Sequence, residues 1–387
     1  MKEVAVIGVG QTRFGKRRDA SLSELAVDAL KEAFEDSKID KKEVKFLSVG
    51  NFGLSSEDVS PASIVAEQAG IHGAMLMRCE AACASGSAAF YVAWMAVSSG
   101  MFDIAVALGV EKMTEVETPT MIEILGRAGS YFWEFHGFGV TFPAYYALYA
   151  TAHMNKFGTT EEDLALVAVK NHKYGARNPK AHFQNEITVE EVLSSRTIAW
   201  PLKLYDCCPI SDGAAAVVLA SKEKVKEMGV DTPVWIKGIG VSSDTSTMGN
   251  RSDFLGLRAS REAAQLAYKM AKVDAKEIEV AEVHDCFTIA EIIAYEDLGF
   301  CKKGEGAKLI REGETEIGGK IPVNIDGGLK AKGHPLGATG VSMIAELTKQ
   351  LREEVEPSRQ APLNKYLALA HNVGGTGQYC YVTVLGR

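Results

Sequence analysis

The sequence lacks the features that would place it in a membrane or outside the cell. No apolar run approaches the roughly 20 residues that a membrane-spanning helix requires. The start, residues 1–8, enters a strand-like run at once, without the charged and apolar regions of a secretory signal. We therefore expect no membrane span and a cytoplasmic protein.

Paired cysteines and concentrated positive charge are also missing. The seven cysteines are irregularly spaced and include no Cys-x-x-Cys pair, which argues against a disulfide framework. Cys79 and Cys83 could share one helix face as metal ligands, but no second pair follows, so we predict no metal site. The net charge of −8 with dispersed basic residues argues against a nucleic-acid partner.

What the sequence does contain is an internal repeat. At 387 residues the chain is too long for one ordinary core. The opening strand-like run, residues 4–10, returns as residues 234–240, and residues 39–50 align without a gap against residues 273–284. The repeat predicts two related halves.

Strands alternate with helices within each half, which is typical of α/β units. We therefore predict a duplicated layered architecture, with central helices between two sheets. The N-terminal half is assigned to residues 1–114 and 201–230, and the C-terminal half to residues 231–387. A capping box over residues 21–24 predicts the first helix.

The first half carries an insertion, which we place at residues 115–200. It is rich in aromatic residues, and a second capping box over residues 159–162 predicts a helix that runs to about Tyr174. Insertions of this length often serve as lids or binding loops. A dimerisation or packing subdomain explains the aromatic residues equally well.

Cys83 and His334 are candidate functional residues because of where the repeat places them. Cys83 precedes a predicted small-residue helix, whose free amides and dipole favour a thiolate. His334, between Gly333 and Pro335, stands at the corresponding helix entrance of the second half. The symmetry of the repeat would bring the two helix N-termini together. Taken alone, each residue is more simply explained as a structural one.

A second imidazole and a second thiol follow the predicted strand at residues 278–283. His284 and Cys286 lie just beyond its carboxyl end, where active residues of open α/β sheets gather. Asp285, between them, is best explained as a residue that orients the loop. The glycine-rich residues 372–377 follow another predicted strand and could aim amides at an oxyanion.

Together these motifs resemble the thiolase superfamily over essentially the whole chain. The resemblance is carried by residues 83–86 (Cys-Ala-Ser-Gly), 333–340 (Gly-His-Pro-Leu-Gly-Ala-Thr-Gly) and 212–216 (Asp-Gly-Ala-Ala-Ala), together with the organisation of the chain in two halves. Ordinary thiolases have Asn-Glu-Ala-Phe where this chain has residues 284–287, and Cys-x-Gly where it has residues 372–374. Both departures resemble the sterol-carrier-protein-2 type and the archaeal acetoacetyl-CoA thiolases, whose second cysteine lies on the other loop.

The resemblance implies a fold and a set of roles. The fold would be two βαβαβαββ halves in a five-layered α-β-α-β-α arrangement with an inserted loop domain. Cys83 would be the nucleophile that becomes acylated, His334 its base, and Cys286 the acid and base at the α-carbon. His334 and a water held by His284 would stabilise the enolate, and the amides of Cys83 and Gly374 would stabilise the oxyanion.

The resemblance also implies substrates and partners. Coenzyme A thioesters would be substrates, with no prosthetic group, and the reaction would join two acetyl-CoA molecules or reverse that step. We expect a homodimer or homotetramer. A complex with a 3-hydroxy-3-methylglutaryl-CoA synthase and a small acyl-CoA-binding bridging protein, in mevalonate or isoprenoid biosynthesis, is expected from archaeal relatives.

Two alternatives remain open at this point. A decarboxylating ketosynthase or a 3-hydroxy-3-methylglutaryl-CoA synthase-like enzyme would share the nucleophile, but Cys286 argues against both. A non-catalytic acyl-CoA-binding scaffold would require that geometry or a blocked tunnel silence a complete set of side chains.

Overall fold

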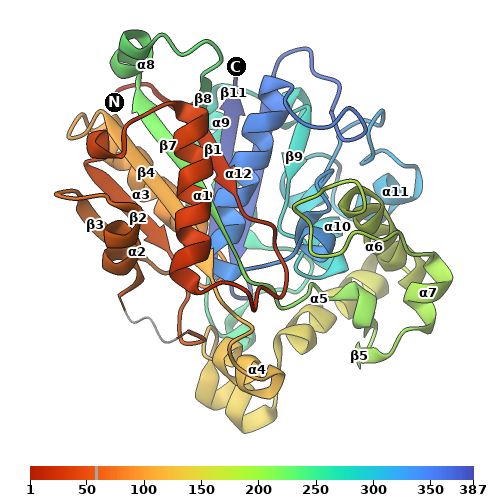
Figure 1. Ribbon diagram of the computed structural model, residues 1–387. Coiled ribbons are helices and arrows are strands. Elements are labelled where there is room, and N and C mark those ends of the chain that lie inside the picture. The colour runs from red at the N-terminus through yellow and green to blue at the C-terminus, as the bar shows by residue number, and fades with distance from the viewer. Residues whose placement is uncertain (57–59) are drawn as a thin grey trace.

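A nine-stranded sheet in two parts organises the molecule, for which a computed structural model describes residues 1–56 and 60–387 (Figure 1). The first part has the strand order β3-β2-β4-β7-β1, and the second has β8-β11-β10-β9. The strands are β1 (Val4–Gln11), β2 (Phe46–Gly50), β3 (Met75–Cys79), β4 (Ile104–Glu111), β7 (Gly213–Ser221), β8 (Val234–Ser243), β9 (Val280–Glu282), β10 (Leu367–Gly374) and β11 (Tyr379–Gly386).

The two parts repeat one another in direction as well as order. β2 runs parallel to β3 and β4, and β7 runs antiparallel to β4 and β1. In the second part β9 runs parallel to β10, and β11 runs antiparallel to β10 and β8. A single bridge from Ala281 to Val323 stands where β3 stands in the first part. The parts meet where β1 pairs with β8, at Ala5–Trp235 and Val6–Val234.

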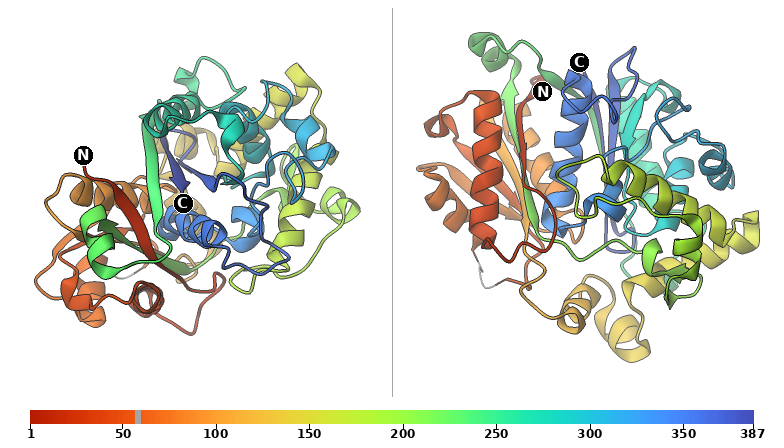
Figure 2. Two further views of the ribbon diagram at one scale, coloured as in Figure 1. Left: turned by 90° about the horizontal axis from the view of Figure 1, so that it is seen from above. Right: turned by 45° about the vertical axis from the view of Figure 1, so that its right-hand side comes forward.

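Helices form three layers around and between the two parts of the sheet (Figure 2). α1 (Leu22–Ser37) and α2 (Pro61–Ala69) cover the outer face of the first part. α3 (Ser85–Ser98) and α12 (Leu336–Arg352) lie between the parts, and α9 (Arg258–Ala271) covers the outer face of the second. The predicted five-layered α-β-α-β-α arrangement is confirmed.

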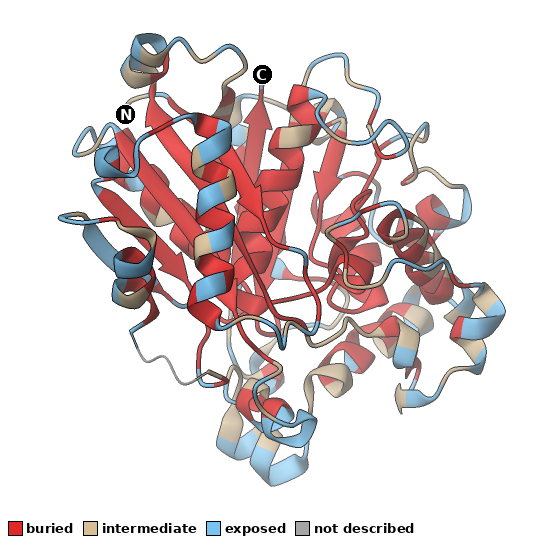
Figure 3. Ribbon diagram, in the orientation of Figure 1, coloured by how far each residue is buried: buried red, intermediate tan, exposed pale blue. Residues whose placement is uncertain are grey.

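The helices of the central layer bury one face of the sheet and pack closely against each other. β1, β4 and β7 are buried along their whole length, because helices cover both faces of the sheet (Figure 3). A Cβ on Gly86 of α3 would lie 2.5 Å from the carbonyl oxygen of Gly337 in α12. The N-terminal turns of the two central helices therefore pack backbone to backbone.

A long segment between β4 and β7 adds a mostly helical region below and beside the layers (Figure 1). Its elements are α4 (Thr118–Gly126), the π-helix η2 (Tyr131–Gly137), α5 (Phe142–Phe157), α6 (Glu161–Gly175), α7 (Val189–Ser194), the strands β5 (Thr197–Ala199) and β6 (Leu202–Lys203), and the 3₁₀ turn η3 (Leu204–Asp206). α6 packs against α10 (Thr288–Asp297), α11 (Gly306–Arg311) and the π-helical η6 (Gly328–Lys332). The proposed boundaries of the halves and of the insertion stay predictions.

Short elements complete the chain. They are α8 (Lys222–Met228) and the 3₁₀ turns η1 (Lys41–Glu43), η4 (Met248–Asn250) and η5 (Ala275–Glu277). Among the described residues, no helix combines the length and the apolar character needed to cross a bilayer.

Two local predictions need correction, and one is confirmed. The capping box of Ser21 and Glu24 is present at the start of α1. The second box is shifted by one residue, because Thr160 caps α6 with Asp163 while the Thr159 hydroxyl bonds the His153 ring at 2.7 Å. The glycine-rich residues 372–377 do not all follow a strand, since β10 continues through Gly374 by pairing with β11.

Candidate active site

Cys83 is held by a tight turn between β3 and α3. Ala82 has a φ of 50°, in the left-handed region that residues with a side chain rarely adopt. Ser85 stabilises this turn, because its hydroxyl accepts a hydrogen bond from the Ala81 amide at 2.9 Å and donates one to the Ala82 carbonyl at 2.6 Å. The turn places Cys83, only 7% exposed, at the entrance of α3.

The resting state of Cys83 differs from the sequence-based expectation. Burial raises the pKa of its thiol to about 12. The amides of Gly375 and of Cys83 itself donate hydrogen bonds to the sulfur and lower the pKa, as the helix-entrance argument predicted, but burial outweighs them. The thiol of the resting enzyme is therefore neutral, and it needs a base.

His334 is oriented to act as such a base. Thr339 donates its hydroxyl to the Pro335 carbonyl at 3.0 Å, so it must accept the 2.7 Å hydrogen bond from His334 Nδ1. His334 therefore carries its proton on Nδ1 and leaves a lone pair on Nε2, which has no partner among the described residues. Burial lowers the pKa of His334 to about 3, which keeps the ring neutral.

His284 lies across from His334, in the loop between β9 and α10. The two rings are nearly perpendicular, with centroids 5.1 Å apart. Burial, and then the neighbouring His334 and His371, lower the pKa of His284 well below its usual range. Its Nδ1 lies 3.0 Å from the side-chain nitrogen of Asn372, and its Nε2 has no partner in the described chain.

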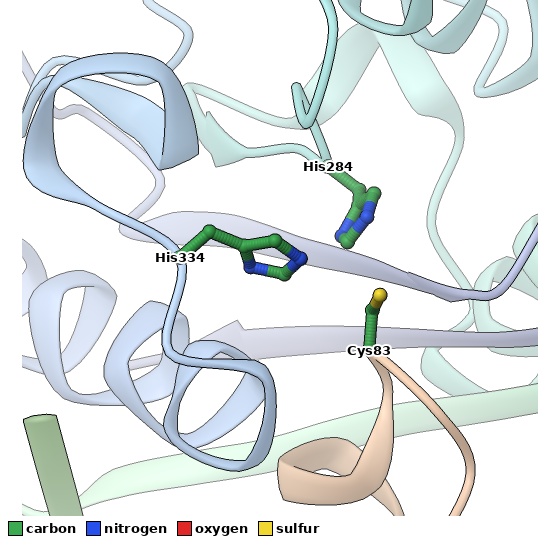
Figure 4. Close-up of side chains that lie close together, drawn as sticks. All are labelled: Cys83, His284 and His334. Atoms are coloured by element: carbon green, nitrogen blue, oxygen red, sulfur yellow. The ribbon is translucent and has the colours of Figure 1, made fainter. Parts of the chain in front are cut away.

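The structure brings three of the predicted residues together from three separate loops. The sulfur of Cys83 and ring nitrogens of His284 and His334 all lie within 4.8 Å of one another, and all three side chains are buried (Figure 4). A sulfur and two imidazole nitrogens are donors that zinc accepts. The cluster is thus both a candidate catalytic centre and the place where a metal would have to bind.

Cys286, the second predicted thiol, is fully buried beside this cluster. Burial raises the pKa of its thiol well above the usual value, and the neighbouring thiols of Cys208 and Cys83 act in the same direction. The amide of Cys208 donates to the Cys286 carbonyl at 3.0 Å, which ties the loop to the segment before β7. The site therefore contains two buried thiols and two buried neutral imidazoles.

Tyr146 of α5 is a site residue that the sequence analysis noted only as one of many aromatic residues. Its hydroxyl donates to the Gly375 carbonyl at 3.5 Å. The same hydroxyl lies beside Cys286 and lowers the pKa of that thiol. Its ring stacks on Phe287 with centroids 4.7 Å apart. A buried tyrosine needs a hydrogen-bond partner, but nothing in the sequence shows which partner it takes.

Asp285 has the orienting contacts that the sequence analysis favoured. Its carboxylate accepts from the amides of Leu329 and Lys330 at 2.7 and 3.1 Å, and from the Asn171 side chain at 2.7 Å. Leu329 and Lys330 belong to η6, which directly precedes His334. Asp285 thus holds the loop of His284 and Cys286 in register with the loop of His334.

Gly374 lies at the end of β10, against the turn of Cys83. A Cβ there would lie 2.2 Å from the Ala81 carbonyl oxygen, so only glycine allows this close approach. The neighbouring Gly375 supplies an amide to the Cys83 sulfur, a contact that the sequence analysis did not assign. The role of the Gly374 amide stays a prediction.

Comparisons with known proteins cover both halves of the chain. The family profile described as "Thiolase, N-terminal domain" matches residues 4–223, and "Thiolase C-terminal domain-like" matches residues 240–387. A relative described as "Acetyl-CoA acetyltransferase" from Methanothermobacter thermautotrophicus is 44% identical, with all of both chains covered.

Two further similarities are more distant. Human "Sterol carrier protein 2" is 34% identical over 97% of this chain and 70% of its own length. The solved structure entitled "Ltp2-ChsH2(DUF35) aldolase" superposes with a TM-score of 0.84 and 29% identity, covering 100% of this chain and 98% of that chain.

Proposed function

The chain belongs to the thiolase family, and from this premise we propose that it is an acetyl-CoA acetyltransferase, which joins two acetyl-CoA molecules to acetoacetyl-CoA and CoA or catalyses the reverse thiolysis. The observation that carries the proposal is the meeting of Cys83 with two neutral imidazoles and a second buried thiol. Full-length similarity to a relative described as an acetyl-CoA acetyltransferase supports the choice of acyl group.

In the first half-reaction Cys83 becomes acetylated. The free lone pair on His334 Nε2 takes the Cys83 proton, and the sulfur attacks the thioester carbon. The amides of Cys83 and Gly374 stabilise the oxyanion in this proposal. When the carbon–sulfur bond to CoA breaks, the CoA thiolate takes the proton of Cys286 and leaves as the free thiol.

In the second half-reaction a new carbon–carbon bond forms. The Cys286 thiolate removes a proton from the α-carbon of a second acetyl-CoA, and protonated His334 and a water held by His284 stabilise the enolate oxygen. The enolate carbon then attacks the acetyl group on Cys83. Acetoacetyl-CoA leaves, and the Cys83 thiolate recovers its proton from His334, which restores every group to its starting state.

Cys286 separates this proposal from the condensing enzymes that share the fold. Decarboxylating ketosynthases and 3-hydroxy-3-methylglutaryl-CoA synthases use a nucleophile like Cys83 but no second catalytic thiol. The Tyr146 hydroxyl beside Cys286 lowers the pKa of that thiol, which is the environment expected for a working second thiol. A non-catalytic scaffold would not require it.

Assays of the wild-type protein test the proposal. We expect CoA-dependent cleavage of acetoacetyl-CoA, and an acetyl adduct on Cys83 by intact-mass analysis with acetyl-CoA. Release of carbon dioxide from malonyl-CoA without thiolysis would instead support a ketosynthase. The absence of both turnover and an adduct would support a scaffold.

In the proposed homo-oligomer, β3 is the contact surface between the copies. In the described part of the chain β3 is an edge strand of the sheet, and Met75, Leu76 and Met77 on it are 50%, 37% and 36% exposed. An exposed edge with apolar side chains is a template for another strand, and an identical edge on a second copy could pair with it antiparallel.

Light scattering tests this contact. We expect Leu76→Lys to convert the oligomer to smaller species, because it places a charge on the shared edge. Met101→Lys is the matched control, since Met101 is 74% exposed but lies outside β3. Equal masses for both variants would contradict pairing through β3.

The unfavourable equilibrium of the condensation supports the proposed partners. Condensation of two acetyl-CoA molecules is uphill, so a biosynthetic role in mevalonate formation would need a step that removes acetoacetyl-CoA. A 3-hydroxy-3-methylglutaryl-CoA synthase, bridged by a small acyl-CoA-binding protein, would supply that step. Co-purification tests the complex, and recovery of a free homo-oligomer alone would contradict it.

All seven cysteines are free thiols, which supports a reducing compartment such as the cytoplasm.

A further inference from the structure

The side chain of Asn372 has an orientation that its neighbours determine. Its Nδ2 lies 3.3 Å from the Cys83 carbonyl oxygen, which can only accept a hydrogen bond. The hydroxyl of Ser87 donates to its Oδ1 at 2.9 Å. The Cys83 carbonyl therefore requires this assignment of oxygen and nitrogen, the Ser87 hydroxyl is compatible with it, and Asn372 itself is buried.

This orientation determines where His284 carries its proton. Asn372 Nδ2 also lies 3.0 Å from His284 Nδ1, and a side-chain amide nitrogen can only donate. His284 Nδ1 must therefore accept. Because the ring is neutral and has one proton, that proton lies on Nε2, the atom that is buried without a partner in the described chain.

His334 has the opposite arrangement. Its Nδ1 donates to Thr339, so its buried Nε2 carries a lone pair. The two neutral rings are nearly perpendicular, with centroids 5.1 Å apart. His284 thus presents a hydrogen-bond donor, and His334 an acceptor, beside the Cys83 sulfur. A thiolase site needs both, since one nitrogen has to receive the thiol proton while the other donates toward an oxygen.

We propose that Asn372 is a positioning residue that fixes His284 as the Nε2–H tautomer, and so divides the two imidazoles into a hydrogen-bond donor, His284, and a proton acceptor, His334. The inference rests on the proposed function and deepens it. The same tautomer would disfavour a metal ion at this cluster. A protonated Nε2 cannot ligate a metal, which leaves Cys83 and His334 as two donors where a zinc site requires three or four.

Asn372→Asp tests the proposal with little change in shape. The carboxylate would accept a proton from His284 Nδ1 and so move the lone pair to Nε2. We expect kcat for thiolysis to fall about 100-fold, as when one oxyanion donor is lost, while acetylation of Cys83 continues. We also expect sensitivity to zinc to rise about tenfold or more, since a carboxylate behind a histidine strengthens metal binding.

Asn364→Asp is the matched control, because Asn364 is exposed and far from these side chains. It should change neither kcat nor zinc sensitivity. If Asn372→Asp matched the control in both, the proposal would be wrong. A loss of kcat with unchanged zinc sensitivity would also overturn it, because general damage to the site would explain that result.

Nitrogen NMR of histidine-labelled wild-type protein tests the same point without a change in Asn372. His284→Gln and His334→Gln identify the two signals. We expect His284 to be protonated on Nε2 and His334 on Nδ1, and the reverse result for His284 would overturn the proposal. If acetoacetyl-CoA were not a substrate, the proposed function would fail, whereas the NMR and zinc measurements would still decide the tautomer.

Discussion

At the scale of single residues, burial decides the protonation of the site. Cys83 has a pKa raised to about 12 and His334 a pKa lowered to about 3, so both are neutral near pH 7. A neutral pair avoids the cost of burying an ion pair before the substrate arrives. Proton transfer then occurs within the reaction.

The neutral His334 gives a prediction for pH dependence. An ordinary histidine base would lose half its activity near pH 6.5. Because the pKa of His334 is about 3, its lone pair stays available well below pH 6.5. We expect the rate of Cys83 acetylation, measured by rapid quench and mass spectrometry, to remain level from pH 7 to pH 5. A half-maximal rate near pH 6.5 would contradict the assignment of His334.

Tyr146 gives a second prediction at this scale. Tyr146→Phe keeps the ring on Phe287 but removes the hydroxyl that lowers the pKa of Cys286. We expect kcat for thiolysis to fall about 10- to 100-fold, since a hydrogen bond from this hydroxyl to the Cys286 thiolate would contribute roughly 1.5–3 kcal/mol, while Cys83 acetylation is unchanged. Tyr149→Phe is the control on the same helix, because that hydroxyl donates toward the Thr376 carbonyl at 3.4 Å. Equal losses in both variants would show a purely structural effect.

At the scale of elements, the meeting of α3 and α12 depends on glycine. A Cβ on Gly86 would lie 2.5 Å from the Gly337 carbonyl oxygen, a backbone atom that cannot move alone. The same two helix entrances carry Cys83 and His334. The contact therefore couples the packing of the central layer to the geometry of the site.

Gly86→Ala tests that coupling. We expect a loss of about 1–3 kcal/mol in the free energy of unfolding, typical of overpacking, together with slower Cys83 acetylation as α3 moves from α12. Gly249→Ala is the control, because no atom lies within 4 Å of a Cβ built there. Urea unfolding and the acetylation assay measure the two effects. Normal acetylation in a destabilised Gly86→Ala protein would contradict the coupling.

At the scale of the whole molecule, the repeat made much of the fold predictable. Strand and helix patterns at residues 39–50 and 273–284 predicted two related halves, and the two parts of the sheet have the same order and directions. The predicted helix entrances of Cys83 and His334 adjoin, because the pseudosymmetric α3 and α12 occupy one central layer. Local patterns were enough for these features.

Other features of the site depend on long-range packing and were not predictable. The raised pKa of Cys83 comes from burial by distant segments, and Tyr146 reaches Cys286 only because α5 folds against the loop after β9. The orientation of Asn372 depends on Ser87 and Cys83, nearly 300 residues away. Sequence spacing contains none of these distances.

Buried neutral histidines also predict how the whole fold responds to acid. His371 is buried against Ser260, and burial lowers its pKa to about 3. Unfolded His371 binds a proton near pH 6.5 and the folded residue does not, so its contribution to stability is complete above pH 6.5 and is lost as pH falls toward 3. We expect a loss of roughly 2 kcal/mol for this residue between pH 6.5 and 5.

Urea unfolding at pH 7 and pH 5 measures this loss. His371→Gln removes the titrating ring, so we expect a shallower dependence on pH than in the wild-type protein. An identical dependence in both proteins would show that His371 does not contribute to it.

The division of labour between two thiols is the central claim, and Cys286→Ala tests it most directly. Intact-mass analysis of this variant with acetyl-CoA, followed by an assay of acetoacetyl-CoA thiolysis, separates the two half-reactions. We predict an acetyl adduct on Cys83 together with nearly abolished turnover. Full turnover in Cys286→Ala would contradict the role of the second thiol, and the absence of the Cys83 adduct in the wild-type protein would contradict the covalent mechanism.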